Sequence, residues 1–319
     1  MKVMFEKALS FYTRYFVVWV ILGGLAAYRW PAPFRALAPW NLAFFALTMF
    51  GIGVVLRRED FRRIAKNPRI VLVGTVAQFT IMPLGAFVVA RLLQLSDELT
   101  LGLILAGSAP GAMSSNVMSY VAKADTAYSV SMTTVSTVLC PFLTPTLTCL
   151  LAQGTEMRVP IFRMTLELLT TVILPLFLGF AVRHFLGERL RKVLPIFPAV
   201  SATFIVFICA LVIALNRQRL QELTGIILVA TLMLNLGGMA AGYGVGALFR
   251  MDLSRRRTLS IEIGMQNAGL GTVLALKHFG AGATIPTAAF VFICILTASG
   301  VASFWQRHPV GLTVADRRY

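Results

Sequence analysis

The sequence predicts an all-α polytopic membrane protein, and three observations lead to this fold class. Of the 319 residues, 57% are hydrophobic and only 13% are charged, whereas an average soluble domain is about 25% charged. Several uncharged stretches reach about 20 residues, the length that crosses a bilayer as a helix. No sustained alternation of apolar and polar residues indicates a β-barrel. This composition argues against a soluble enzyme, a disordered protein or a secreted disulfide scaffold.

We expect ten apolar spans along the chain. Six of them carry no charge, and they cover residues 70–90, 101–122, 126–155, 194–216, 224–249 and 279–306. Four are shorter or carry one or two charges, and they cover residues 11–28, 41–56, 161–182 and 258–276. Two of these charges, Arg163 and Glu167, are four residues apart in the sixth span, and this spacing predicts a local ion pair.

The basic residues predict the orientation of these spans. The net charge is +16, and Lys and Arg cluster in the loops after the second, sixth and eighth spans and in the C-terminal tail. Such clusters mark cytoplasmic loops that face anionic lipid, so this charge indicates membrane lipid rather than nucleic acid as a partner. With ten spans, both termini are cytoplasmic. The absence of a transit peptide favours the bacterial cytoplasmic (inner) membrane.

An even split gives two units of five spans with opposite orientation, residues 1–155 and 156–319. Inverted repeats of this kind are typical of secondary transporters. Two pairs of polar residues support the split, because Asn116 and Asn267 are 151 positions apart and Gln78 and Asn235 are 157 apart.

The fourth span contains a proline in its middle, which predicts a broken or kinked helix. Pro110 lacks an amide hydrogen and is flanked by Gly107 and Gly111. The backbone groups that the break frees at membrane depth must find partners, and ions or substrate are one possibility. A simple kink packed by small residues is the alternative. Four polar residues follow the break and favour a binding site, namely Ser114, Ser115, Asn116 and Ser119.

The fifth and ninth spans carry further polar groups. Ser129 and Thr133 share one helix face, although hydroxyls in membrane helices often bond a carbonyl one turn back. Glu262 lies inside the ninth span without a cationic neighbour in that span. An intramembrane carboxylate is a functional candidate, and it must be protonated, paired from elsewhere or bound to a metal ion. An interfacial pairing with the Arg255–Arg257 cluster is the simplest alternative. Carboxylate, hydroxyl and amide oxygens together suit a hard monovalent cation.

These motifs resemble the bile acid:sodium symporter family, and most closely its bacterial branch of bile-acid and pantoate or ketopantoate transporters. The resemblance rests on the strings at residues 110–120 and 262–269 and on the Ser/Thr-rich stretch between them, and it extends over essentially the whole chain. It implies ten helices in two inverted five-helix repeats, divided into a panel and a core. In this family, the fourth and ninth helices are unwound and cross at the centre.

The resemblance also implies two sodium sites and no organic cofactor. The first site would comprise Ser115, Asn116, Ser129, Thr133 and Glu262. The second would comprise Gln78, Glu262, Gln266 and the backbone carbonyls of Ile263 and Met265. On the substrate side, Ser114 and Asn267 match the polar character of the family, Met113 replaces a small hydroxyl residue of some relatives, and Cys294 stands where some have His.

We therefore expect a sodium-coupled importer of a small organic anion that works by alternating access and has no obligate protein partner. A proton-coupled transporter with Glu262 as the proton carrier is the first alternative. A membrane-embedded enzyme using Ser115 and Glu262 is a second, although no His or Lys lies in these spans to activate the serine. The absence of a GxxxxGK[ST] loop argues against ATP-driven transport by this chain. A channel is disfavoured, because the polar residues cluster at one level.

Overall fold

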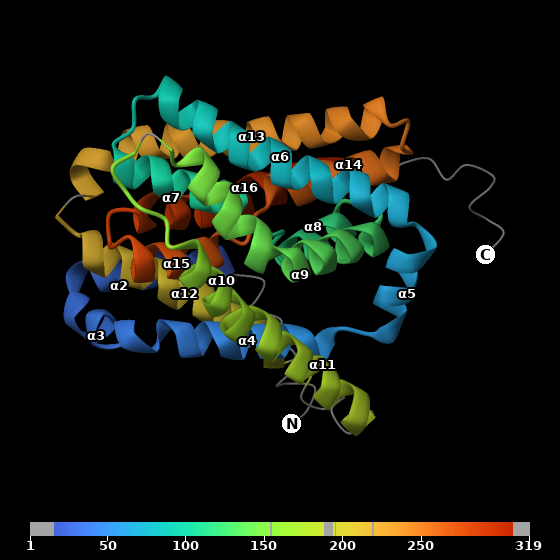
Figure 1. Cartoon of the computed structure of the whole chain (residues 1–319), viewed down its shortest axis with the longest axis horizontal. Helices are drawn as coiled ribbons and strands as arrows, with labels where there is room; N and C mark the ends of the chain where they lie inside the picture. Colours follow the sequence, from blue (N-terminus) through green and yellow to red (C-terminus); the bar gives the residue numbers. More distant parts are fainter. Residues whose placement is uncertain (1–15, 154, 188–193, 195, 219, 309–319) are drawn as a thin grey trace.

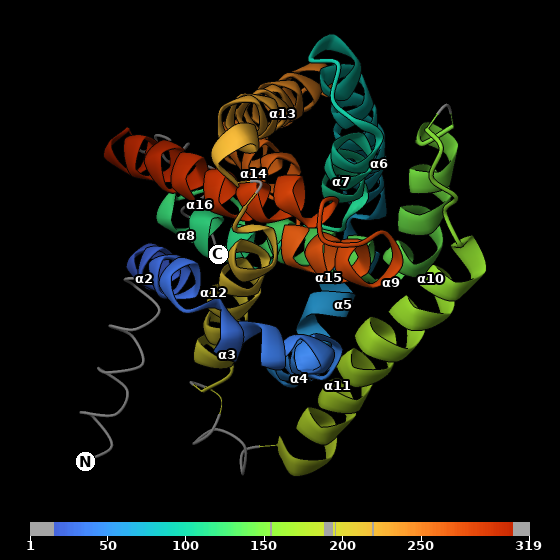
Figure 2. The same cartoon turned by 90° about the vertical axis from the view of Figure 1, so that its left-hand side faces the viewer.

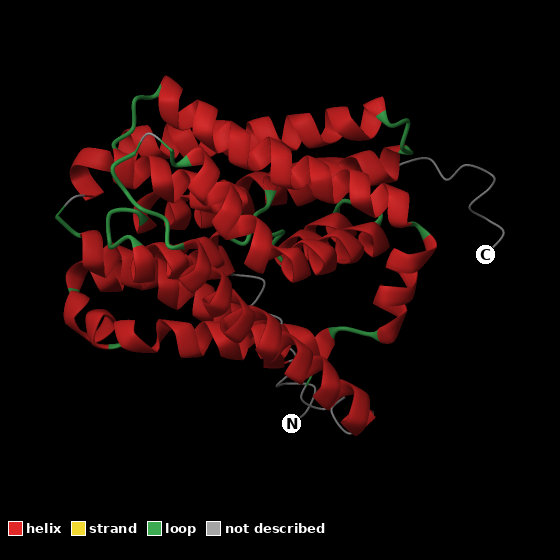
Figure 3. Ribbon diagram, in the orientation of Figure 1, coloured by secondary structure: helices red, strands yellow, loops and turns green. Residues whose placement is uncertain are grey.

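The computed structural model describes residues 16–153, 155–187, 194, 196–218 and 220–308. The described part of the chain is helical and contains no strands (Figures 1 and 3). Its first half comprises α2 (Phe16–Arg29), α3 (Pro31–Ala36), α4 (Asn41–Val55), α5 (Arg58–Lys66), α6 (Pro68–Leu92), α7 (Asp97–Ser108), α8 (Ser114–Val121) and α9 (Thr126–Leu151). Its second half comprises α10 (Ile161–Leu168), a π-helical turn (Leu169–Ile173), α11 (Leu174–Leu186), α12 (Ile196–Asn216), α13 (Leu220–Leu248), α14 (Leu253–Gly264), α15 (Ala268–His278) and α16 (Thr284–Arg307).

The protein is an integral membrane protein. Six helical stretches of the described chain are long and apolar enough to cross a bilayer, namely Ala38–Val55, Pro68–Leu92, Thr126–Leu151, Ile161–Leu186, Gly225–Leu248 and Thr284–Arg307. Shorter apolar helices cover Val18–Arg29 and Ala202–Asn216. Many large apolar side chains on the outside are exposed, such as Leu72 at 63% and Phe142 at 58%. An apolar exterior of this extent is stable against lipid rather than water.

The prediction of a helix break at Pro110 is confirmed. α7 ends at Ser108, Ala109 is extended, and α8 begins only at Ser114. A second break separates α14 from α15 at residues 265–267, where Met265 is extended. The sequence contains no proline at this second break, and the unwinding of this span was expected only from the family resemblance, which the break bears out. The two breaks give four half-helices whose ends lie inside the protein.

The helices pack in two groups, which Figure 2 separates. The smaller group comprises α2, α3, α4, α11 and α12, and the larger group comprises α6 to α9 and α13 to α16. The long stretch from α10 to α11 belongs to both, because α10 packs against α9 and α11 packs against α4. The contact between α4 and α11 is close, since an added Cβ on Gly53 would lie 2.0 Å from the Leu176 carbonyl oxygen. Small residues permit such contacts in membranes.

The predicted pair between Arg163 and Glu167 is wrong. The Glu167 carboxylate instead lies 2.6 Å from Lys277 Nζ and 2.7 Å from His278 Nε2, both at the end of α15. The Glu167 side chain is 6% exposed, whereas Arg163 is exposed. The Glu167 side chain therefore lies on the buried face of α10, towards the larger helix group, whereas Arg163 lies on the exposed face.

Candidate functional site

The two helix breaks cross and are joined by backbone hydrogen bonds. The amide of Ala112 donates to the Met265 carbonyl over 3.0 Å, and the amide of Asn267 donates to the Pro110 carbonyl over 2.7 Å. Gly111 and Gln266 form an isolated antiparallel bridge between these bonds. Backbone groups freed by a helix break must find partners in the interior of a membrane protein. Here the backbone groups of the two broken segments form hydrogen bonds with each other, and these bonds fix the position of four helix ends.

Glu262 lies beside this crossing and is fully buried. Its Oε2 atom lies 2.6 Å from Ser115 Oγ on α8 and 2.6 Å from Ser129 Oγ on α9. The hydroxyl of Thr133 donates to the other carboxylate oxygen, Oε1. Asn116 adds an amide oxygen 3.4 Å from Thr133 Oγ1. The structure thus brings together all five residues of the first predicted set.

The interfacial pairing of Glu262 with the nearby arginines is excluded. Arg255 lies 3.3 Å from Asp125, and the Arg257 guanidinium donates to the His308 carbonyl over 2.8 Å. Only hydroxyls donate to the Glu262 carboxylate among the described residues. An anion in this environment is stabilised fully only by a proton or a bound cation.

The residues of the second predicted set also lie together at the crossing. Gln78 on α6 and Gln266 are buried, and Gln78 Nε2 donates to Gln266 Oε1 over 3.1 Å. The side-chain Nε2 of Gln266 in turn donates to the Ile263 backbone carbonyl over 3.1 Å. The Met265 carbonyl accepts from Ala112. Gly111 lies between the two sets, because an added Cβ would lie 2.6 Å from Glu262 Oε1 and 3.4 Å from Gln78 Nε2.

A narrow crevice lies between the two helix groups and reaches the crossing. The smaller group lines it with Met49, Ile52, Leu56 and Leu176, and the larger group lines it with Gly111, Met113, Thr134, Thr137 and Asn267. Its volume of about 10 Å³ is roughly the space that one water requires. The crevice therefore has no room for an organic molecule in this conformation.

Two of the four predicted substrate residues line this crevice, Met113 and Asn267. Asn267 also caps α15, because its Oδ1 accepts from the Leu270 amide over 3.2 Å. Ser114 begins α8 and is half-buried outside the lining, and Cys294 is buried in α16 with its thiol 3.3 Å from the Val291 carbonyl. Sequence reasoning missed the apolar lining residues of α4 and α11, which no polar motif distinguishes from ordinary lipid-facing or core residues.

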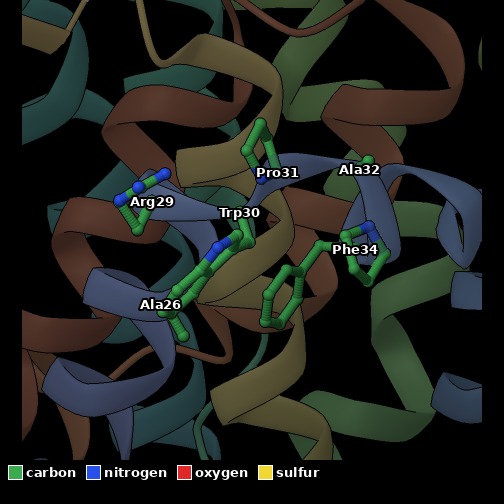
Figure 4. A pocket seen from close by; sticks show the side chains of 7 residues that line it. Ala26, Arg29, Trp30, Pro31, Ala32 and Phe34 are labelled. Carbon is green, nitrogen blue, oxygen red and sulfur yellow. The ribbon is translucent and has the colours of Figure 1, made fainter.

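A second hollow lies far from the crossing, at the corner between α2 and α3. Figure 4 shows its lining, which includes Arg29, Trp30 and Phe34. The Arg29 guanidinium lies 5.4 Å from the centre of the Trp30 ring. The hollow is open to the outside and contains none of the predicted site residues. An arginine and an exposed tryptophan at a helix end are typical of the membrane–water interface.

Comparison with known proteins identifies the family. The model of the Sodium Bile acid symporter family matches residues 42–223. The chain is 35% identical over 303 residues to an uncharacterized sodium-dependent transporter, YocS, of Bacillus subtilis (strain 168), with 95% of this chain and 94% of the relative covered. It is 33% identical over 294 residues to the probable sodium/metabolite cotransporter BASS1, chloroplastic, of Arabidopsis thaliana, with coverage of 92% and 73%. It is 28% identical over 283 residues to the sodium/bile acid cotransporter 4 of Homo sapiens, with coverage of 81% and 64%. The chain therefore belongs to the sodium bile acid symporter family, a family of sodium-dependent transporters.

Proposed function

We propose that this protein is a sodium-coupled symporter that imports a small organic anion. The observation that carries this proposal is Glu262, a fully buried carboxylate at the crossing to which only hydroxyls donate. Hard cations prefer oxygen ligands such as carboxylates, hydroxyls, amides and backbone carbonyls. Two groups of residues with such oxygens meet at the crossing, and Glu262 belongs to both. The names of the relatives agree with a transporter rather than an enzyme.

The first sodium ion is held by Ser115, Asn116, Ser129, Thr133 and Glu262 in this proposal. The second is held by Gln78, Glu262, Gln266 and the carbonyls of Ile263 and Met265. Two monovalent cations against one carboxylate leave a net charge of +1 at the crossing, which favours an anionic substrate beside it. The substrate is a carboxylate of the pantoate, ketopantoate or bile-acid type.

The substrate site lies in the crevice between the two helix groups. Asn267 and Met113 line the crevice and flank the crossing. The first backbone amides of α15 lie directly after Asn267, and a helix N-terminus favours a negative group. Ser114, at the start of α8, and Cys294 complete the proposed substrate set. Sodium binding orders the crossing and thereby raises the affinity for substrate, which is a coupling between the two sites.

Transport proceeds by alternating access in this proposal. The smaller helix group acts as the panel and the larger group as the core, within ten spans that form the inverted repeats 1–155 and 156–319. Movement of one group against the other opens the crevice to each side in turn. In this proposal both termini are cytoplasmic and the chain lies in the inner membrane of a bacterium, and the clusters of basic residues support this orientation.

A proton-coupled transporter is the second candidate, and the same residue favours it. A protonated Glu262 in this set of hydroxyls is neutral, so it needs no metal ion to be stable in the interior. The two candidates differ in which cation stabilises the folded protein, and this difference can be measured without knowledge of the substrate.

The experiment is a thermal unfolding titration of the purified protein in detergent, with sodium exchanged for potassium at constant ionic strength. A ligand that binds the folded state raises its apparent stability. We expect a saturable, sodium-specific rise in Tm that is lost in Glu262→Gln. Glu167→Gln is the matched control, because Glu167 is also a buried carboxylate but lies outside the crossing; it keeps the sodium response. Equal melting in the two salts contradicts sodium coupling, and a response to pH that depends on Glu262 then supports the proton-coupled candidate.

A further inference from the structure

Three successive backbone carbonyls at the end of α14 have three different donors. The Ile263 carbonyl accepts from the Gln266 side chain, and the Met265 carbonyl accepts from the Ala112 amide. Between them, the Gly264 carbonyl accepts from the side chain of Asn235 on α13, over 2.7 Å. The helix ends at Gly264, so these carbonyls lack the amide partners that a continuing helix provides. Each carbonyl of this segment is therefore oriented by a specific external group.

Asn235 is fully buried, and nothing in the proposed ion sites includes it. α13 packs closely along α14 at this level, because an added Cβ on Gly238 would lie 3.5 Å from the Ile263 carbonyl oxygen. An added Cβ on Gly264 would lie 2.2 Å from Met239 Cγ on α13. The close packing places the Asn235 amide directly against the last carbonyl of α14.

The carbonyl oxygen of the Asn235 side chain indicates a role beyond packing. Its Oδ1 atom is buried and has no hydrogen-bond partner in the part of the chain that the structure describes. An unpartnered buried acceptor is destabilising, and an apolar side chain of similar size would avoid that cost. The chain nevertheless places an amide here. Gln78 on α6 reaches the same short segment through its bond to Gln266.

We propose that Asn235 is a positioning residue for the second sodium site. By holding the Gly264 carbonyl against α13, it keeps the neighbouring carbonyls of Ile263 and Met265 available on the side of Gln78 and Gln266. Without this bond, the Gly264 carbonyl competes for the donors that orient its two neighbours, and the segment loses its shape. The inference rests on the proposed sodium-coupled function, since it concerns how a site of that function is oriented.

The test is the sodium titration of Tm in Asn235→Leu, which is close in volume but has no donor. Groups that orient ion ligands typically contribute 10- to 100-fold to metal affinity. We expect the sodium concentration for half-maximal stabilisation to rise about tenfold or more, and the Hill coefficient to fall towards one. Asn216→Leu is the matched control, because Asn216 is also buried and also donates to a backbone carbonyl, that of Val212. It lowers Tm in both salts but keeps the sodium titration of the wild type.

Asn235→Ser provides a smaller polar variant if Asn235→Leu does not fold, and the same shift is expected. A folded variant of either kind that titrates with sodium as the wild type does overturns the positioning role. A wild-type protein without any sodium response contradicts the proposed function instead, so the two failures are distinguishable.

Discussion

Glu262 shows how a single residue organises the site. A carboxylate is expensive in the interior of a membrane protein, and this one is reached by hydroxyls from both α8 and α9. Ser115 lies on the short helix after the first break, while Ser129 and Thr133 lie on one face of α9. The three hydroxyls are polar but uncharged, so they leave the charge of Glu262 available to a cation or a proton.

Gly111 leads to a prediction at the residue scale. An added Cβ would lie 2.6 Å from Glu262 Oε1, which is too close for this oxygen to keep its position. We expect Gly111→Ala to displace this carboxylate and to raise the sodium concentration for half-maximal stabilisation by about tenfold. Sodium titration of Tm measures this shift. Gly237→Ala is the control, because an added Cβ there meets nothing within 4 Å; an equal sodium affinity in both variants contradicts the prediction.

At the scale of elements, the stretch from α10 to α11 connects the two helix groups. α10 packs against α9, a π-helical turn follows at Leu169–Ile173, and α11 packs against α4. Glu167 ties the last turn of α10 to the last turn of α15 through Lys277 and His278. Cations also suit the C-terminal end of a helix such as α15. The start of α15 carries Asn267, so one short helix joins this ion cluster to the crossing.

This cluster gives a prediction for stability. Glu167→Gln removes the charge that pairs with Lys277 and His278, and we expect a loss of about 1–2 kcal/mol, because hydrogen bonds to charged groups contribute about 1.5–3 kcal/mol and bonds in membrane proteins somewhat less. Equilibrium unfolding in mixed micelles measures the loss. Arg163→Gln serves as the control, since Arg163 is exposed and should change stability by less than about 0.5 kcal/mol. A larger effect of Arg163→Gln would contradict this prediction and would indicate that Arg163 pairs with Glu167.

For the whole molecule, the important boundary is the crevice between the two helix groups. One wall is apolar and comes from α4 and α11, and the other wall carries the polar groups of α9 and the crossing. Its volume is about 10 Å³, so neither an organic molecule nor a thiol reagent fits in this conformation. The proposed transport cycle therefore requires a change in the packing of whole helices rather than of single side chains.

Thiol labelling tests this motion. Thr137 lines the crevice and is 7% exposed, so we expect Thr137→Cys to react with a small water-soluble thiol reagent at a rate that changes with sodium. The wild type measures the background from its own four cysteines. Thr231→Cys is the control, because Thr231 is fully buried in α13 and does not line the crevice. Equal, sodium-independent labelling of both variants contradicts opening of the crevice.

Much of the fold and of the candidate site could be predicted. The apolar stretches predicted a helical membrane protein because hydrophobicity acts segment by segment. Pro110 predicted the first helix break because a proline acts on its own helix. The second break had no such local signal, since it follows Gly264 and depends on the bonds that the segment makes with Pro110 and Ala112. The ten-span count, the repeat boundaries and the ion ligands remain predictions.

The sequence by itself determined the class of protein and the first helix break, and it singled out Glu262 as a candidate, since each depends on composition or on covalent geometry along a short segment. Only the tertiary structure decided the partners. Glu167 pairs with Lys277 and His278 rather than Arg163, and Asn235 holds the Gly264 carbonyl. These contacts join positions about 30 to 110 residues apart. The physical reason is that a buried polar group bonds whichever donor the packing of helices brings within reach, and that packing is a property of the whole chain.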